Sequence, residues 1–211
     1  MIKNEFLHEL TISSTQRRFG TTNNLRDVKK IQSWLTLYEY KHPGSGTATQ
    51  IDGDFGPATE LAVKNFQSAI NKNRTGVVSQ NLFSMMTDPL EMAFTTSGGN
   101  GSVRDRIKAV AMNHLVQRPR ELIINGESNL GPWIRSYMDG DDGQFQFWCV
   151  GFVLAVIDQA VSELGADFTD YMPLTKACDD LGNHAQSTGT FINNFHWRSN
   201  PDLVQEGDIF L

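Results

Sequence analysis

Cys149 is the residue of this chain whose type and position most directly suggest covalent chemistry. It lies in the stretch QFWCVGFVLAV, where a polar approach gives way to an apolar run that predicts a helix. A helix N-terminus stabilises an anion by about 0.3–1 kcal/mol, which is too little to turn a thiol into an effective nucleophile at neutral pH. Cysteine nucleophiles are therefore paired with a histidine that acts as the base.

The histidines of the chain offer few partners for such a nucleophile. We expect His114 on the polar side of a helix, which leaves His184 and His196 as substitutes for the base. His196 is the better candidate, because it lies between two aromatic residues shortly before the end of the chain. Two other interpretations of Cys149 stay open: a small buried side chain, or one half of a disulfide with Cys178.

The elements that must position these residues fall into two parts, joined by the stretch TTSGGNGS at residues 95–102. A row of small polar residues and glycines cannot bury a face, so we expect a flexible linker there. Ser102 and Asp105 have the spacing of a capping box and predict that a helix begins at this point. We therefore divide the chain into one domain at 1–94, with an N-terminal extension, and another at 103–211.

The first part has the pattern of a small helical bundle. Apolar residues three and four apart predict a helix over 25–38, and Pro57 suits the first turn of a second helix. Asp52 and Gly53 form a tight-turn dipeptide before that helix. A third, short helix is expected at about 79–86. With the helices of the second part, this predicts an α+β fold that is predominantly helical.

The motifs of the first part, from about Asp27 to Met86, resemble the three-helix peptidoglycan-binding-like domain of many cell-wall hydrolases. The resemblance rests on Val28…Ile31-Gln32…Leu35, Asp52-Gly53-x-Phe55-Gly56-x-x-Thr59 and Ala62-Val63-x-x-Phe66-Gln67. It implies that peptidoglycan is a partner, recognised through its glycan or its peptide stem. A purely structural or docking role for the same bundle is the alternative.

The second part, from about Arg104 to the last residue, resembles the papain-like CHAP fold, the cysteine, histidine-dependent amidohydrolases/peptidases. The resemblance rests on Asn129-x-Gly131-Pro132, Tyr137, Gly143…Trp148-Cys149 and the closing stretch LVQEGDIFL at 203–211, which is similar to a strand of the family. It implies that Cys149 attacks an amide of the peptidoglycan stem or cross-bridge and forms a thioester. Asn129, Trp133 and Trp148 are the expected substrate-binding residues, although Asn129 could equally cap a turn and Trp133 could equally be core.

The end of the chain departs from the CHAP pattern. The family histidine follows the Gly-Asp strand, but here Gly207-Asp208 is followed by three apolar residues only, so no residue matches that histidine. We expect either a longer natural product or a degenerate family member. The predicted function is accordingly a peptidoglycan hydrolase with a wall-binding module, enzymatic by ancestry. The alternative is a non-catalytic wall-binding or structural component of a phage or injection apparatus.

The composition of the chain excludes some classes of function. A net charge of −6 without a basic run argues against nucleic-acid binding, and the longest apolar run, Val150–Ile157, is too short to span a bilayer. The N-terminus lacks the features of a signal peptide, so we expect synthesis in the cytoplasm and action at the cell wall after release or delivery. We expect no cofactor. Calcium on Asp139, Asp141 and Asp142 is the alternative, although their spacing does not fit an EF-hand.

Overall fold

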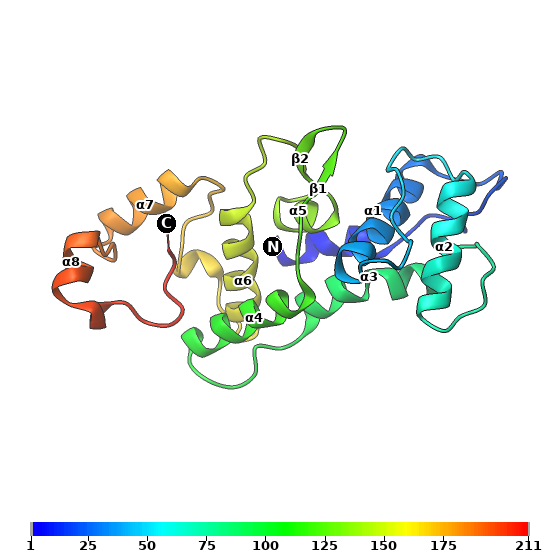
Figure 1. The fold of residues 1–211 in the computed structure, drawn as a ribbon. Coiled ribbons are helices and arrows are strands. Elements are labelled where there is room, and N and C mark those ends of the chain that lie inside the picture. The colour runs from blue at the N-terminus through cyan, green and yellow to red at the C-terminus, as the bar shows by residue number, and fades with distance from the viewer. Residues whose placement is uncertain (1, 211) are drawn as a thin grey trace.

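The structure is a computed structural model and describes residues 2–210, which form a predominantly helical α+β fold (Figure 1). This confirms the predicted fold class. The elements in chain order are η1 (Ile2–Leu10), α1 (Leu25–Lys41), α2 (Pro57–Ala69), α3 (Gln80–Thr95), α4 (Val103–Gln117), β1 (Leu122–Ile124), β2 (Glu127–Leu130), α5 (Pro132–Tyr137), α6 (Cys149–Ser162), η2 (Phe168–Asp170), α7 (Cys178–Ser187), α8 (Asn194–Ser199) and η3 (Pro201–Leu203). None of the described helices combines the length and the apolar character needed to cross a membrane.

Local signals place the first three α-helices. The Asn24 side chain accepts hydrogen bonds from two backbone N–H groups at the start of α1, and Pro57 opens α2 as predicted. Ser79 caps α3, but this helix continues nine residues past Met86, where we expected it to end. The extension persists because Leu90 and Phe94 are buried against other elements, and this packing outweighs the Pro89 inside the helix.

The turn before α2 is built around the buried amide of Gln32. Its Nε2 donates to Asp52 Oδ1 at 2.8 Å, and its Oε1 accepts from the backbone N–H of Gly53 at 2.8 Å. Gly53 has a φ of +87°, a conformation that favours glycine. Hydrogen bonds from the backbone of Asp54 and from Gln32 lower the pKa of Asp52. The Asp-Gly motif therefore shapes the turn.

The two parts of the chain share one apolar core. Phe6 of η1 stacks on Phe94 of α3 at a centroid distance of 4.6 Å, and η1 also contacts α5 and α6. Trp34 of α1 packs edge-on against Trp133 of α5 at 6.1 Å. Figure 1 shows the N-terminus beside α5, so the first residues of the chain lie against the second part.

The stretch predicted as a flexible linker is bonded to the second part. Thr95 is still helical, Ser97 Oγ and the Gly98 N–H donate to the two carboxylate oxygens of Glu163 at 3.0 and 3.1 Å, and Arg106 pairs with the same carboxylate at 2.9 Å. These contacts hold part of the stretch against the second part, and its role as a flexible linker stays a prediction. The predicted capping box of Ser102 is confirmed, whereas the division into two domains stays a prediction.

The closing stretch does not form the predicted strand. Residues 204–210 run in turns and irregular backbone after η3, and Leu211 lies outside the described residues. Glu206 and Asp208 pair with Lys108 and Arg104 of α4, which hold the segment along that helix. A strand needs a neighbour for its backbone groups, and the described residues provide none here. In the described part of the chain the named strands pair only as the antiparallel hairpin β1–β2.

Candidate functional site

Cys149 is the first residue of α6 and is exposed, as a thiol at a helix start must be to react. The rest of α6 is largely buried, and its approach to α5 is unusually close. A Cβ on Gly151 would lie 2.5 Å from the carbonyl oxygen of Tyr137, and Ala155 is fully buried. The absence of a side chain at Gly151 thus allows the close packing of α6 against α5. This packing fixes the position of Cys149, two residues earlier in the chain.

The thiol nearest to Cys149 is that of Cys178, at the start of α7, with 3.6 Å between the two sulfurs. Both cysteines are free and exposed, so the interpretation of Cys149 as a small buried side chain is wrong. The hydrogen bond with Cys149 raises the pKa of the Cys178 thiol, and burial and the Asp179 carboxylate add to this rise. The disulfide with Cys178 that the sequence left open is not formed in this structure, although the two thiols lie side by side. Sequence reasoning assigned Cys178 no other role, because a separation of 29 residues does not indicate that the two helix starts meet.

No described histidine is hydrogen-bonded to Cys149. His196, the substitute candidate, lies exposed on the short helix α8, with Phe195 edge-on at 6.2 Å. Figure 1 shows α7 and α8 at the end of the molecule opposite α2. The structure therefore brings Cys149 together with Cys178, and the role of His196 as the base stays a prediction.

His114 lies in the core, not on the polar side of α4 as we expected. Its Nε2 lies 3.2 Å from Gln159 Oε1 and its Nδ1 lies 2.8 Å from Tyr137 Oη. The Gln159 amide nitrogen donates to the carbonyls of Ala93 and Thr96, so its oxygen accepts from His114 Nε2–H, and Nδ1 accepts from the tyrosine hydroxyl. Burial lowers the pKa of His114 to about 4, although the Gln159 bond opposes this, so the ring is neutral at pH 7.

The three predicted substrate-binding residues have different surroundings. Trp133 is buried and packs on Trp34 and Tyr137, which makes it part of the core. Asn129 has a φ of +55° and donates from Nδ2 to the carbonyl of Gln144 at 3.1 Å, so it shapes the loop before Cys149. Trp148 is half-buried and stacks on Tyr137 at 5.8 Å. Trp148 thus remains the aromatic side chain of this set next to the thiol.

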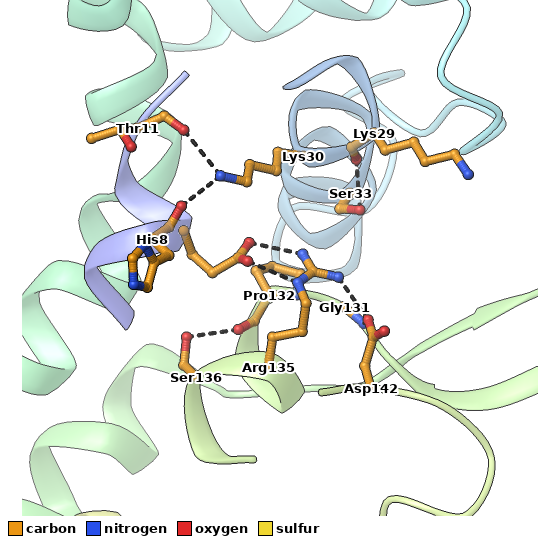
Figure 2. A network of polar contacts seen from close by, with 11 residues as sticks. His8, Thr11, Lys29, Lys30, Ser33, Gly131, Pro132, Arg135, Ser136 and Asp142 are labelled. Carbon is orange, nitrogen blue, oxygen red and sulfur yellow. Dashed lines mark hydrogen bonds and ion pairs between the residues drawn. The ribbon is translucent and has the colours of Figure 1, made fainter. Parts of the chain in front are cut away.

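The acidic loop before Cys149 is held by cations of the protein itself. Asp139 pairs with Lys176 at 2.6 Å, and Asp142 pairs with Arg135 at 2.6 Å, as Figure 2 shows for the second pair. Within residues 2–210, no group of three or more His, Cys, Asp or Glu side chains could hold a metal ion. The calcium alternative therefore has no site in this part of the chain.

A hollow of about 420 Å³ lies on the first part of the chain, between the end of α2 and the start of α3. Lys72 and Asn81 lie on its rim and Leu82 and Met85 contribute apolar surface. Its volume falls within the usual range of about 300–1,000 Å³ for ligand pockets. The side chains of Lys72 and Asn81 make no polar contact with other described residues, which leaves them available to a ligand.

Comparison with known proteins supports the resemblance of the first part. A family model described as a peptidoglycan binding domain matches residues 24–86, which contain α1, α2, the 420 Å³ hollow and the beginning of α3. Searches of curated proteins and of solved structures give no significant match. The peptidoglycan-binding likeness predicted for the first part is thus confirmed. The match does not extend beyond residue 86, so the CHAP likeness of the second part stays a prediction.

Proposed function

We propose that this protein binds peptidoglycan through residues 24–86 and acts at the bacterial cell wall. The family match to these residues carries the proposal, and the geometry supports it. The motif residues Gln32, Asp52 and Gly53 are used in holding the turn together. We therefore infer that other, exposed polar groups of the bundle contact the wall polymer.

The 420 Å³ hollow is the surface that we assign to the polymer. Sugars bind through hydrogen bonds at their edges and apolar contact at their faces. Lys72 and Asn81 provide free donors, and Leu82 with Met85 provides apolar surface. The buried amide of Gln67 holds the wall of the hollow through Thr75 Oγ1 and the Gly76 N–H. Gln67 is therefore a positioning residue.

Co-sedimentation with purified, protein-free peptidoglycan sacculi tests this assignment. We expect the intact chain to pellet with sacculi and the double variant Lys72→Ala with Asn81→Ala to lose at least 10-fold in affinity. The matched control is Asn183→Ala with Arg198→Ala, two exposed residues on α7 and α8. A chain that stays in the supernatant would overturn the proposed function. Equal binding by both double variants would move the contact surface elsewhere on the bundle.

Amide hydrolysis is a second candidate function, favoured by the exposed Cys149 thiol at the start of α6. In this reaction the thiolate attacks an amide carbonyl of the stem or cross-bridge, the amine leaves with a proton, and water then hydrolyses the thioester. Incubation of sacculi with the reduced protein, followed by mass spectrometry of the released peptides, tests it. Release that Cys149→Ala abolishes and Cys178→Ser preserves would support hydrolysis.

The competing role is a wall-binding or structural component of a phage or injection apparatus without catalysis. The rate of Cys149 alkylation by iodoacetamide separates the two roles. An enzyme requires a thiol that reacts at pH 6 faster than an ordinary thiol, because the thiolate is the reactive form. If Cys149 is alkylated at the rate of an ordinary thiol and no peptide is released from sacculi, the non-catalytic binding role is supported.

A further inference from the structure

Two exposed thiols meet where α7 lies against the start of α6. Cys149 and Cys178 are the first residues of these two helices, and their sulfurs lie 3.6 Å apart. Both cysteines are free and exposed, so a small molecule in solution can reach either sulfur. Two thiols in contact can lose two electrons and two protons together and form a disulfide. Neither of them belongs to the peptidoglycan-binding match at 24–86.

The residues that follow α5 position both thiols. Gly151 of α6 packs on Met138, whose sulfur would lie 2.6 Å from a Cβ at that glycine. Lys176, two residues before Cys178, donates to the Met138 carbonyl at 3.1 Å and pairs with Asp139 at 2.6 Å. Two adjacent residues therefore hold the starts of both helices, which accounts for a contact between thiols 29 positions apart.

The two thiols differ in how firmly they keep their protons. The hydrogen bond with Cys149 raises the pKa of the Cys178 thiol, and burial and the Asp179 carboxylate raise it further. The shared proton therefore stays on Cys178, whose S–H donates to the sulfur of Cys149. Because the thiolate is the attacking form in thiol–disulfide exchange, Cys149 is the thiol that should react first.

The packing of α7 is slight compared with that of α6. Most residues of α6 are buried, whereas Leu181 alone is buried among the described residues of α7, and none is buried in α8. Local opening costs least where few apolar contacts must be broken. A covalent bond between the two helix starts would therefore restrain α7 much more than its apolar contacts do.

We propose that Cys149 and Cys178 form a reversible redox site that reacts with small disulfides, ties α7 to α6 when oxidised and withholds the Cys149 thiol from other reactions. The Cys149 thiolate attacks one sulfur of the external disulfide, and the released half takes up the proton that Cys149 has lost. The Cys178 sulfur then attacks Cys149 Sγ and displaces the second half, which takes up the proton of Cys178. One external disulfide thus becomes two thiols, and a small dithiol reverses the reaction.

The oxidation state of this site bears on the two candidate functions in different ways. Action at the cell wall, as proposed above, takes the chain out of the reducing cytosol, and disulfides persist in such compartments. Amide hydrolysis by Cys149 would then require a reductant. Binding through residues 24–86 would not, because the two cysteines lie outside them.

Equilibration of the intact chain with mixtures of reduced and oxidised glutathione measures how strongly the fold favours the pairing. Alkylation of the remaining thiols and mass spectrometry give the disulfide fraction, and from it the effective concentration of one thiol toward the other. Flexible segments give effective concentrations of about millimolar. We expect the folded chain to exceed the same chain in concentrated urea at least 10-fold. Equal values would overturn the proposal, since the fold would then contribute nothing.

Single-cysteine variants assign the two steps. In Cys178→Ser, oxidised glutathione should modify Cys149 as fast as the natural chain loses its first thiol. In Cys149→Ser, Cys178 should be modified several-fold more slowly, because burial and Asp179 still favour its protonated form. Modification of Cys178 as fast as that of Cys149 would overturn the assigned order.

Amide hydrogen exchange tests whether the disulfide ties α7 to α6. The amides of α7 should exchange at least 10-fold more slowly in the oxidised chain than in the reduced chain. Those of α2, at the opposite end of the molecule in Figure 1, should exchange equally in both. The matched control is Cys178→Ser with the same oxidant, which should exchange like the reduced natural chain. Unchanged exchange of α7 on oxidation would overturn the tie.

Sedimentation with sacculi and peptide release separate this inference from the proposed function. Both redox forms should pellet equally, because neither thiol belongs to residues 24–86. A chain that does not pellet but still pairs its thiols would overturn wall binding and support the redox site. Where the reduced chain releases peptides, the oxidised chain should release at least 10-fold less. Equal release by both forms would overturn the withholding of Cys149.

Discussion

Arg135 of α5 forms a two-pronged ion pair with Glu9 of η1, with Nε–Oε1 and Nη2–Oε2 distances of 2.8 Å each. The guanidinium also reaches Asp142, and Lys30 of α1 donates to the carbonyl of Thr11 nearby (Figure 2). Burial alone would lower the pKa of Arg135, but the Glu9 and Asp142 carboxylates raise it above its ordinary value. The contact joins residues 126 positions apart and fixes η1 against the second part.

The first prediction concerns this pair. Arg135→Met leaves the Glu9 carboxylate, 7% exposed at its side chain, without its cation. An unpaired buried charge is costly, so we expect the free energy of unfolding to fall by about 3 kcal/mol. Urea denaturation measures the loss. The control Lys64→Met breaks the partly exposed pair with Glu60, whose side chain is 22% exposed, and should have a smaller effect. Equal losses would mean that Glu9 finds another partner or becomes solvated.

The second prediction concerns the contact between α5 and α6. Gly151→Ala would place a Cβ 2.5 Å from the Tyr137 carbonyl oxygen, a backbone atom that cannot rotate away. Alanine favours a helix over glycine by about 1 kcal/mol, but displacement of α6 should outweigh this gain. We expect a net destabilisation of about 1–2 kcal/mol and a changed rate of Cys149 alkylation. A stabilised variant with unchanged alkylation would show that the two helices separate without cost.

The third prediction concerns the two thiols. Their sulfurs must approach by roughly 1.5 Å to reach the length of a disulfide. Oxidised glutathione should accept the two electrons and two protons of Cys149 and Cys178, which yields one intramolecular disulfide and two molecules of glutathione. Mass spectrometry after trypsin digestion should find the two cysteines in one linked peptide pair. In Cys178→Ser, Cys149 should instead carry glutathione, and a linked wild-type pair that never forms would contradict the prediction.

The fourth prediction concerns acid stability. The pKa of His114 falls from 6.5 in the unfolded chain to about 4 in the folded protein, so only the unfolded chain binds this proton between those values. The contribution of the neutral ring is present above pH 6.5 and is lost as the pH falls toward 4. Between pH 7 and pH 5 we expect a loss of about 2 kcal/mol, measured by urea denaturation at both pH values.

His114→Gln provides the control for this pH dependence. The variant should be less stable at pH 7, because it alters the bonds to Tyr137 and Gln159, but it has no imidazole to titrate. Its stability should therefore change much less between pH 7 and pH 5. A variant with the same loss as the natural chain would assign the effect to other groups.

The features predicted correctly from the sequence depend on residues close together in the chain. The capping box of Ser102 and Asp105, the proline that opens α2 and the helix that begins at Cys149 all follow from local spacing. Local patterns thus predicted α1, α2, α3, α4 and α6 and the helical class of the fold, whereas α5, α7 and α8 were not predicted.

The features that we missed depend on contacts between distant residues. α3 continues beyond Met86 because Phe94 packs on Phe6 and His114, and neither partner is visible from the helix itself. His114 seemed polar because its partners, Tyr137 and Gln159, lie 23 and 45 residues away. Cys178 likewise has no local signal that places it beside Cys149. Individual residues of the candidate site could be named from the sequence, but the contacts between them could not be predicted.

The bonds from Ser97 and Gly98 to Glu163 give the molecule a fixed internal orientation. A flexible linker would let the second part take many orientations relative to the helical bundle. The docked segment removes that freedom, so the Cys149 face keeps one orientation relative to the helical bundle.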